Sequence, residues 1–374
     1  MSTRRTTARR RPALAAAAAA LLLAGCSGGT GGEGGGDGGP GTAPAQARGS
    51  AVSAERCAQN EAAGTITYLT GYQFQASASI LDPVAAEALG YFDAVCLDVE
   101  LQPGSGETAQ NAQLVAAGTA QVSSIAGASD VLVNVDNGVD VTAVALFGHV
   151  PVATLLTRPD VTDLSQLEGT VLGHKGALPV TIDAMLRSAG VDVASIEQVQ
   201  VGYDPSVLVR GQVRSLTAYK SNEPLTLRAL GEEVVEWNPE DYAVPGSMAT
   251  TIVTPAFLAE HPTAVQDFLR AQLRAFAHCE EHAAECVGYA AERSQAGYDT
   301  EHNEQVWTTE AQLVRGSQPA GQPLGAIDVA TVRTEAQFLL DAGRIAAVPD
   351  LDALVDEDVV AGLYSGGELV WPVP

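Results

Sequence analysis

Residues 65–103, TITYLTGYQFQASASILDPVAAEALGYFDAVCLDVELQP, contain the pattern that decides the fold. The run 65–69 is rich in β-branched and aromatic residues, which favours a β-strand. The alanine-rich run 80–89 predicts a helix, because Gly90 follows it where a left-handed cap is expected. Apolar residues alternate with acids over 96–101, which predicts a second strand. The stretch therefore indicates a strand, a helix and a strand in succession.

This succession is typical of a βαβ unit, in which a right-handed crossover joins two parallel strands. The loop 70–79 follows the first strand, so it lies at the carboxyl edge of the predicted sheet, where open α/β folds bind ligands. Tyr72, Gln73 and Phe74 belong to this loop. We expect all three to contact a ligand.

The same alternation continues along the chain and predicts an α/β fold with two lobes. The first lobe is expected over 57–157 and the second over 158–246, and the chain returns to the first lobe over 247–374, ending in helices. Two apolar strands, 152–157 and 250–253, are predicted to cross between the lobes. The opening between the lobes is the expected ligand site.

Several segments resemble a known family. The first helix ends in Ala86-x-x-x-Gly90-Tyr91-Phe92 before Leu97-Asp98-Val99-Glu100, and later pieces read LVAAG at 114–118, LSQLEG at 164–169 and YKSNEP at 219–224. They are similar to the solute-binding proteins of ABC importers for thiamine-pyrimidine precursors, riboflavin, alkanesulfonates and nitrate. The resemblance extends over residues 65–340. It implies a type II periplasmic-binding-protein fold, a solute trapped by hinge closure, and an ABC permease as partner.

The amino terminus predicts export. Five arginines precede the apolar run 13–23, which is too short to span a bilayer and is typical of a signal peptide. Leu23-Ala24-Gly25-Cys26 resembles a lipoprotein cleavage site, so residues 1–25 are expected to be removed and Cys26 to carry the membrane anchor. The paired arginines leave the general and the twin-arginine export routes both open. The glycine-rich segment 26–56 is predicted to be a flexible tether.

Charge and length bound the mature chain. Removal of residues 1–25 takes away five of the 20 basic residues and none of the 45 acidic ones, which leaves 15 against 45 and a net charge near −30. Such an acidic surface argues against nucleic acid as a partner, because phosphate contacts need clustered Lys and Arg. The remaining length suffices for two lobes. We expect a monomer.

Four cysteines besides Cys26 fit an exported chain with disulfides. Cys57 precedes the first predicted strand and Cys96 begins the second, so both fall at the amino ends of parallel strands and are expected to pair. Cys279 and Cys286 would be too far apart on one unbroken helix. A turn near residues 281–284, where the resembling family often breaks its long helix, would allow them to bridge.

The chain has only two lysines, Lys175 and Lys220, against eighteen arginines. Both follow predicted strands of the second lobe, at the edge that should face the opening. A lysine ammonium suits a carboxylate, sulfonate, phosphate or ring acceptor of a solute. The alternative is that Lys220 pairs with Glu223 and that Lys175 is a solvated loop residue.

Aromatic and polar side chains complete the predicted site. Two pairs of rings, Tyr72 with Phe74 and Tyr203 with Tyr219, are expected to hold a flat heterocycle between the lobes. The alternative is that some of these rings, Phe74 and Tyr219 above all, belong to the core. The resemblance implies that Asn222 and Glu223 hydrogen-bond ring nitrogens or amines. Further candidates are Ser105, Ser124, His149 and His174.

Enzymatic signatures are weak. The glycine-rich segment 104–109 imitates a dinucleotide fingerprint, but it follows the second strand of the βαβ unit instead of the first. Beyond the predicted signal peptide and tether, the sequence has neither a Gly-x-Ser-x-Gly elbow nor a Gly-Lys-Ser/Thr phosphate loop. His278, Cys279 and His282 could bind zinc, but the segment 278–282, His-Cys-Glu-Glu-His, lacks the metalloprotease spacing of glutamate. We therefore expect no catalytic residue, no cofactor and no metal.

The sequence predicts a lipid-anchored receptor on the outer face of the cell membrane that captures a small solute for an ABC permease. A thiamine-pyrimidine precursor or related nitrogen heterocycle is the first expectation. The second is a small sulfonate or carboxylate clamped by both lysines. An enzyme of pyrimidine synthesis with the same fold is the alternative from another class, although the sequence carries nothing similar to that enzyme's iron-binding cysteine cluster.

Overall fold

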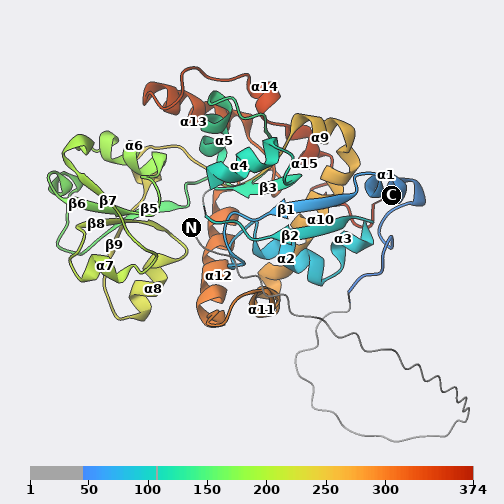
Figure 1. The fold of residues 1–374 in the computed structure, drawn as a ribbon, viewed down its shortest axis with the longest axis horizontal. Helices are drawn as coiled ribbons and strands as arrows, with labels where there is room; N and C mark the ends of the chain where they lie inside the picture. Colours follow the sequence, from blue (N-terminus) through green and yellow to red (C-terminus); the bar gives the residue numbers. More distant parts are fainter. Residues whose placement is uncertain (1–44, 107, 374) are drawn as a thin grey trace, which may run out of the picture. The chain divides into compact units, whose positions relative to one another are not determined.

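The computed structural model describes residues 45–106 and 108–373. They belong to one compact unit, 42–374, whereas the other unit, 1–41, lies outside the described residues. Two five-stranded sheets organise the described unit, and helices cover both (Figure 1). The predicted α/β architecture with two lobes is confirmed.

The first sheet has the order β2-β1-β3-β10-β4. β1 is parallel to β2 and β3, as the βαβ pattern predicts, and β10 runs antiparallel between β3 and β4. The chain therefore returns to this sheet after building the second lobe. The strands are β1 (Thr65–Leu69), β2 (Asp98–Gln102), β3 (Val122–Ile125), β4 (Thr142–Gly148) and β10 (Met248–Val253).

The second sheet has the order β7-β6-β8-β5-β9. Its strands are β5 (Ala153–Thr157), β6 (Val171–His174), β7 (Glu197–Gln200), β8 (Ser215–Tyr219) and β9 (Val235–Trp237). The predicted lobe boundary at residue 157 is wrong, because β5 pairs with β8 and β9 and so belongs to the second sheet. The chain passes between the lobes just before β5 and just before β10.

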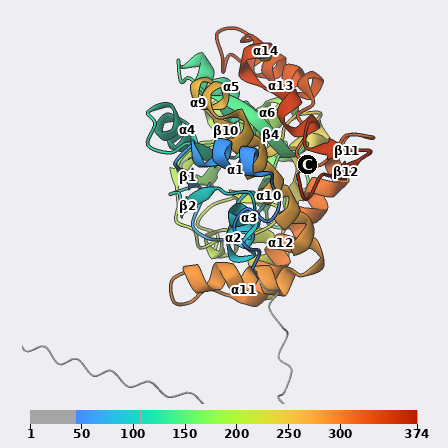
Figure 2. The same cartoon turned by 90° about the vertical axis from the view of Figure 1, so that its right-hand side faces the viewer.

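Helices fill the connections and dominate the carboxyl-terminal third (Figures 1 and 2). The first-lobe helices before the crossing are α1 (Ala54–Glu61), α2 (Leu81–Ala88), α3 (Tyr91–Ala94), α4 (Thr108–Ala116) and α5 (Ala128–Asp136). The second lobe contributes α6 (Val180–Ser188), α7 (Ser206–Val209) and α8 (Glu223–Ala229). After β10 come α9 (Pro255–Glu260), α10 (Pro262–Glu281), α11 (Ala283–Arg293), α12 (Thr300–Ser317), α13 (Val329–Asp341), α14 (Leu351–Leu354) and α15 (Glu357–Ala361), and a short hairpin, β11 (Tyr364–Ser365) with β12 (Glu368–Leu369), closes the chain.

The core of the first lobe is centred on α10, which packs against α2 and α3. Phe268 lies 5.2 Å from the ring of Tyr68 on β1 and 5.1 Å from that of Phe92 on α3, measured between ring centroids. Phe276 makes an edge contact of 4.9 Å with Trp307 of α12. Burial of such large rings supplies much of the apolar free energy that holds the helices to the sheet. The core thereby fixes α12 in place.

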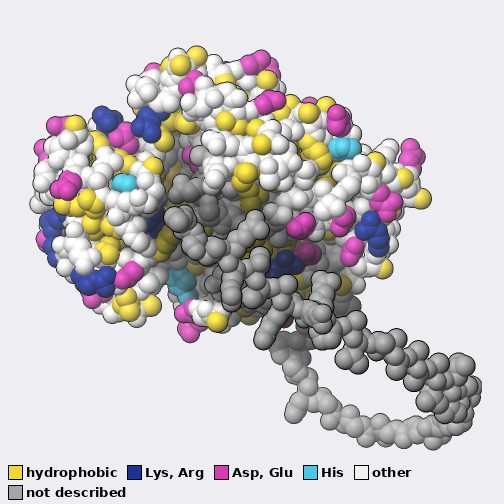
Figure 3. Space-filling view, viewed as in Figure 1, with side chains coloured by type: hydrophobic (Ala, Val, Ile, Leu, Met, Phe, Trp, Pro, Cys, Tyr) yellow, Lys and Arg dark blue, Asp and Glu magenta, His cyan; other side chains and the backbone are white. Residues whose placement is uncertain are grey.

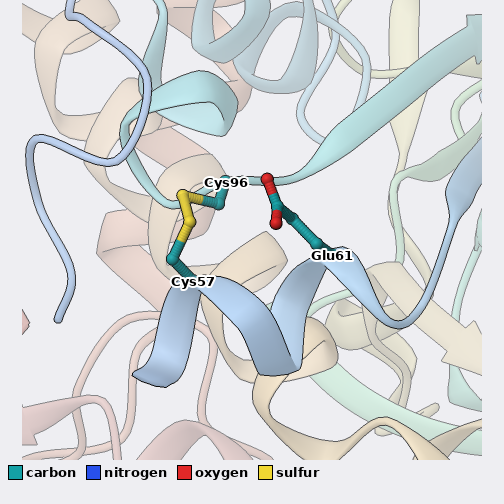
Figure 4. Close-up of side chains that lie close together, drawn as sticks. All are labelled: Cys57, Glu61 and Cys96. Atoms are coloured by element: carbon teal, nitrogen blue, oxygen red, sulfur yellow. A yellow bond between two sulfur atoms is a disulfide. The ribbon is translucent and has the colours of Figure 1, made fainter. Parts of the chain in front are cut away.

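A disulfide joins Cys57 to Cys96 with a Cα–Cα distance of 5.2 Å, as predicted. Cys57 lies on α1, however, and not directly before β1. Figure 4 shows Glu61 beside the two sulfurs, and within the described chain these residues form the only group of three or more potential metal ligands that lie close together. Because the sulfurs are bonded to each other, neither is the thiolate that a metal would need.

A second disulfide joins Cys279 to Cys286 with a Cα–Cα distance of 5.7 Å. It forms because α10 ends at Glu281 and α11 begins at Ala283, with His282 in a non-helical conformation between them. This confirms the predicted turn. The bond also explains why Cys279 is not available as a metal ligand.

The predicted tether, 26–56, extends too far at its carboxyl end. Gln46 N donates to Leu89 O and Ala51 N donates to Ala94 O, at 3.0 and 2.9 Å. Ser53 then caps α1, which begins at Ala54. Small residues in this stretch pack their backbone closely against the α2–α3 region, which composition alone does not reveal. The remainder of the predicted tether, with Cys26, lies outside the described residues, as does the predicted signal peptide 1–25.

Among the residues that the structure describes, no helix combines the length and apolar character needed to cross a bilayer. Acidic side chains are spread over both lobes on the face drawn in Figure 3.

Candidate functional site

A cavity of about 180 Å³ lies between loops of the two lobes. The first lobe lines it with the loop after β1, the end of β3 and α12, and the second lobe with the loops after β6, β7 and β8. The carboxyl ends of parallel strands meet there, as the alternation of strands and helices predicts. Its volume is below the roughly 300–1,000 Å³ of drug-sized sites, so it suits a small solute.

Lys175 and Glu223 form an ion pair at this cavity. The exposed fraction of the side chain is 15% for Lys175 and 2% for Glu223. Glu223 also accepts the backbone N–H of Tyr219 at 2.8 Å. Burial lowers the pKa of Lys175 to about 8, while the neighbouring carboxylate favours its charged form. The alternative that Lys175 is a solvated loop residue is therefore wrong.

Lys220 does not line the cavity. Its ammonium donates to Pro151 O at 2.7 Å and contacts the Glu240 carboxylate at 2.5 Å, next to the segment that crosses between the lobes. Both the placement of Lys220 in the site and its alternative pairing with Glu223 are therefore wrong. β8 ends at Tyr219, whose side chain does line the cavity, and successive side chains of an extended chain point to opposite faces.

Tyr72 and Tyr203 meet across the lobes with ring centroids 5.7 Å apart. A heterocycle stacked between two rings would need about 7 Å, two contact distances, so no flat solute fits between them here. The Lys175 ammonium lies 5.8 Å from the centre of the Tyr203 ring, which is 61% exposed. Gly106 adopts φ +96° beside them, and a Cβ there would lie 3.0 Å from the Tyr72 ring. The two tyrosines thus close one side of the cavity.

Several predicted residues lie away from the cavity. Phe74 packs on the first core with the Arg293 guanidinium 5.7 Å from its ring centre, as its structural alternative predicts. Gln73 and Ser105 are exposed and outside the lining. His149 is half-buried, and its backbone N–H donates to Ser317 Oγ. Burial lowers the pKa of the His149 ring. His174 ends β6 and does not line the cavity either.

Glu310 of α12 reaches the cavity from the first lobe. Its carboxyl accepts the backbone N–H of Ala78 at 2.6 Å and the hydroxyl of Ser221 at 2.7 Å. Ser221 belongs to the loop after β8, so this hydrogen bond joins the two lobes. Burial raises the pKa of Glu310 to about 7.

A second hydrogen bond from α12 also joins the lobes. His302 Nε2 lies 2.8 Å from Oδ1 of Asn222, which precedes α8. Since an amide oxygen only accepts, His302 Nε2 is the donor. The Asn222 side chain therefore does not cap α8, and Asn222 contributes to lobe contact as well as to the cavity lining.

The model of the NMT1/THI5-like family matches residues 79–286. The chain belongs to this family. No curated protein matches it. The predicted family group and the periplasmic-binding-protein fold are thereby confirmed.

Solved structures similar to this chain share its fold. One, from Bordetella bronchiseptica RB50, has a TM-score of 0.60 and 17% identity, and the match covers 80% of this chain and 96% of that one. The periplasmic aliphatic sulphonate-binding protein SsuA from Escherichia coli has a TM-score of 0.57 and 12% identity, with coverage of 83% and 96%. The alkanesulfonate-binding protein SsuA from Xanthomonas axonopodis pv. citri, bound to MOPS, has a TM-score of 0.54 and 14% identity, with coverage of 78% and 98%.

In this NMT1/THI5-like chain the cavity brings together part of the predicted set: Tyr72, Ser124, Lys175, Tyr203, Tyr219, Asn222 and Glu223. Sequence reasoning missed Glu310. A signal for it exists, because Glu310 shares one face of α12 with the buried Trp307 and Val314, at helical spacing. An acid on an apolar face indicates a buried polar role, and Glu310 has one.

Proposed function

We propose that this chain is the extracytoplasmic solute-binding protein of an ABC importer and captures a small nitrogen heterocycle, a thiamine-pyrimidine precursor or a relative. The observation that carries the proposal is the cavity itself, which residues of both lobes line at the carboxyl ends of parallel strands. A site divided in this way forms only when the lobes close, which is how a hinge-closing receptor holds its solute.

The contacts between the lobes support capture by closure. Glu310 with Ser221, His302 with Asn222, and Tyr72 with Tyr203 all link first-lobe to second-lobe groups around the cavity. Opening of the hinge would break these contacts together and release the solute toward a permease. The tyrosines would then act as a closing pair at the side of the solute and not as a sandwich around it.

A small sulfonate is the second candidate. The structures from E. coli and X. axonopodis are described as sulfonate-binding. Lys175 would supply the cation, but it would have to leave Glu223 to do so. Lys220 would not contribute, because it is engaged with Glu240 and Pro151.

Binding is preferred over catalysis for a specific reason. The pyrimidine synthase with this fold consumes its own histidine, and here both histidines expected near the opening, His149 and His174, lie outside the lining. The remaining parts of the proposal concern location: a lipid on Cys26 would hold the monomeric receptor at the outer face of the membrane, where a permease can accept the solute.

Mass spectrometry of the purified protein under native conditions, followed by a thermal-shift screen of pyrimidines, flavins and sulfonates, tests the proposal. We expect one small solute to bind at a ratio of one per chain and to raise the melting temperature by mass action. Conversion of a pyrimidine substrate, or loss of a histidine from the protein's own mass, would instead support the enzyme.

A further inference from the structure

The charges at the cavity distinguish among the solutes that the proposed function allows. Among the described lining residues, the charged or titratable groups with strong acid or base character are Lys175, Glu223 and Glu310. Lys175 is already paired with Glu223. The hydrogen-bond partners of Glu310 are neutral, namely Ala78 N, Ser221 Oγ and the Ser77 side chain, and Glu310 makes no salt bridge within the described chain. The charged groups of the cavity are therefore one ion pair, which is neutral as a whole, and one further carboxyl group.

The Glu310 carboxyl has room for further donors. Ser221 donates to its Oε1 and Ala78 to its Oε2, and the Ser77 side chain is a third hydrogen-bond partner. A carboxylate offers about four lone-pair sites in all, two on each oxygen. One acceptor site therefore remains, and a solute donor can take a second in place of the Ser77 hydroxyl, since Ser77 and Glu310 both line the cavity.

We infer that Glu310 determines solute specificity by accepting N–H donors from an amidine-like edge, such as that of an aminopyrimidine, and that it selects against anionic solutes. This inference rests on the proposed function. An amino group beside a protonated ring nitrogen presents two parallel N–H bonds, which match the two oxygens of one carboxylate.

The electrostatics favour such a solute over an anion. Burial raises the pKa of Glu310 to about 7, which shows that an unpaired carboxylate is costly there. A solute that brings a positive charge or N–H donors offsets this cost. A sulfonate would place a second negative charge beside it, and the single lysine at the cavity is already neutralised. Glu310 thus disfavours the solutes that the sulfonate-binding structures bind.

Calorimetric titration of the full chain tests the inference with three probes: the hydroxymethyl-aminopyrimidine precursor of thiamine, the same pyrimidine without its amino group, and ethanesulfonate. The aminopyrimidine should bind wild type most tightly. Glu310→Gln should weaken its binding about 10- to 100-fold, the loss expected when a charge-assisted hydrogen bond is removed. Glutamine is close in shape, and the Ser221 hydroxyl can reverse its role to accept from the new amide.

Glu335→Gln is the matched control. Glu335 is equally buried, its pKa is also raised to about 7 by burial, and it accepts the Ser129 hydroxyl at 2.6 Å, but it lies outside the cavity lining. This variant should bind the aminopyrimidine like wild type. The melting temperature of each unliganded variant checks its folding.

Four results would overturn the inference. Unchanged aminopyrimidine affinity in a folded Glu310→Gln variant, or tighter binding of ethanesulfonate by wild type, would remove Glu310 as the selecting group while the receptor function stands. If Glu335→Gln weakened aminopyrimidine binding as much as Glu310→Gln does, the loss of affinity would be due to general destabilisation. Failure of wild type to bind any of the three probes would contradict the proposed heterocycle and sulfonate receptor, and this inference with it.

Discussion

The two lysine-bearing loops of the second lobe differ although their sequence contexts look alike. Lys175 follows β6 and lies at the cavity against Glu223, whereas Lys220 follows β8 and lies against Glu240 at the crossing between the lobes. Each lysine comes directly after another predicted site residue, His174 or Tyr219. In each adjacent pair only one member lines the cavity, Lys175 in one and Tyr219 in the other.

This difference teaches that position after a strand is not enough to place a side chain in a site. Adjacent residues can both line the cavity, as Asn222 and Glu223 do, but at these two strand ends one side chain faces the cavity and its neighbour faces away. The prediction included both members of both pairs. The structure shows that only one member of each pair lines the cavity.

Among the substitutions that test this difference between the two loops, Lys175→Met should have the largest effect on stability and solute binding. It leaves the Glu223 carboxylate, 2% exposed, without its cation, and breaking a buried pair costs about 3–5 kcal/mol of unfolding free energy. Solute binding should be lost as well. Chemical denaturation and the ligand-induced thermal shift measure the two effects. The double variant with Glu223→Gln should recover part of the stability, and a fully additive loss would show that the pair is not coupled.

The pH dependence of stability tests the buried acids, one of which, Glu310, lines the same cavity as Lys175. Burial raises the pKa of Asp82, Glu310 and Glu335 to about 7. The folded protein therefore keeps protons that the unfolded chain releases above about pH 4, so these groups stabilise most at low pH and lose that contribution as the pH rises to about 7. The loss is on the order of 3–4 kcal/mol per carboxyl.

Denaturation from pH 5 to 8 measures this slope, and Glu335→Gln should reduce it. A stability that rises through this range in wild type and is unaffected by the substitution would contradict the account of the buried acids.

Lys220→Met should have a smaller effect of a different kind. The Glu240 side chain is 35% exposed and can be hydrated, so the main loss is the hydrogen bond to Pro151 O, about 1–2 kcal/mol. Solute affinity should remain within about twofold of wild type, as measured by calorimetry. Loss of solute binding in a stable Lys220→Met variant would show that Lys220 belongs to the site, as Lys175 does.

Tyr203→Ala should have the smallest effect. It removes the ring contact with Tyr72 and the approach of the Lys175 ammonium, together worth about 0.5–1.5 kcal/mol of lobe closure. The solute should dissociate about two- to tenfold faster, as stopped-flow displacement can measure. Leu230→Ala is a matched control, because Leu230 is similarly exposed at 60% and does not line the cavity. Equal rates for both variants would show that Tyr203 does not retain the solute.

The sequence was sufficient to predict the βαβ unit and the two lobes, because periodicity and caps are local signals. The positions of Cys57 and Cys96 before two parallel strands predicted their pairing, whereas the bridge between Cys279 and Cys286 also needed the helix break that the family resemblance implies. The start of the second lobe was misplaced, because the apolar pattern of β5 does not indicate which of the two sheets the strand joins. The prediction also missed α1, because the small residues of 45–56 have a linker composition yet pack through their backbone.

The candidate site was only partly predictable. The loops after β1 and β6 carry Tyr72 and Lys175, and α8 begins with Glu223 just after β8, since the topology brings these strand ends together. Glu310 comes from a helix more than two hundred residues beyond the first of these loops, and only the tertiary packing of α12 brings it there. His149 and His174 show the converse, because nearness in sequence to a site does not direct a side chain into it.

The most direct test of the central claim is a crystal structure of the protein with the solute that copurifies with it. The account predicts one small molecule enclosed between the lobes, hydrogen-bonded to Glu310 or to the Lys175–Glu223 pair, with Lys220 still bound to Glu240. A solute seated elsewhere, or one held by Lys220 with the present cavity empty, would contradict it.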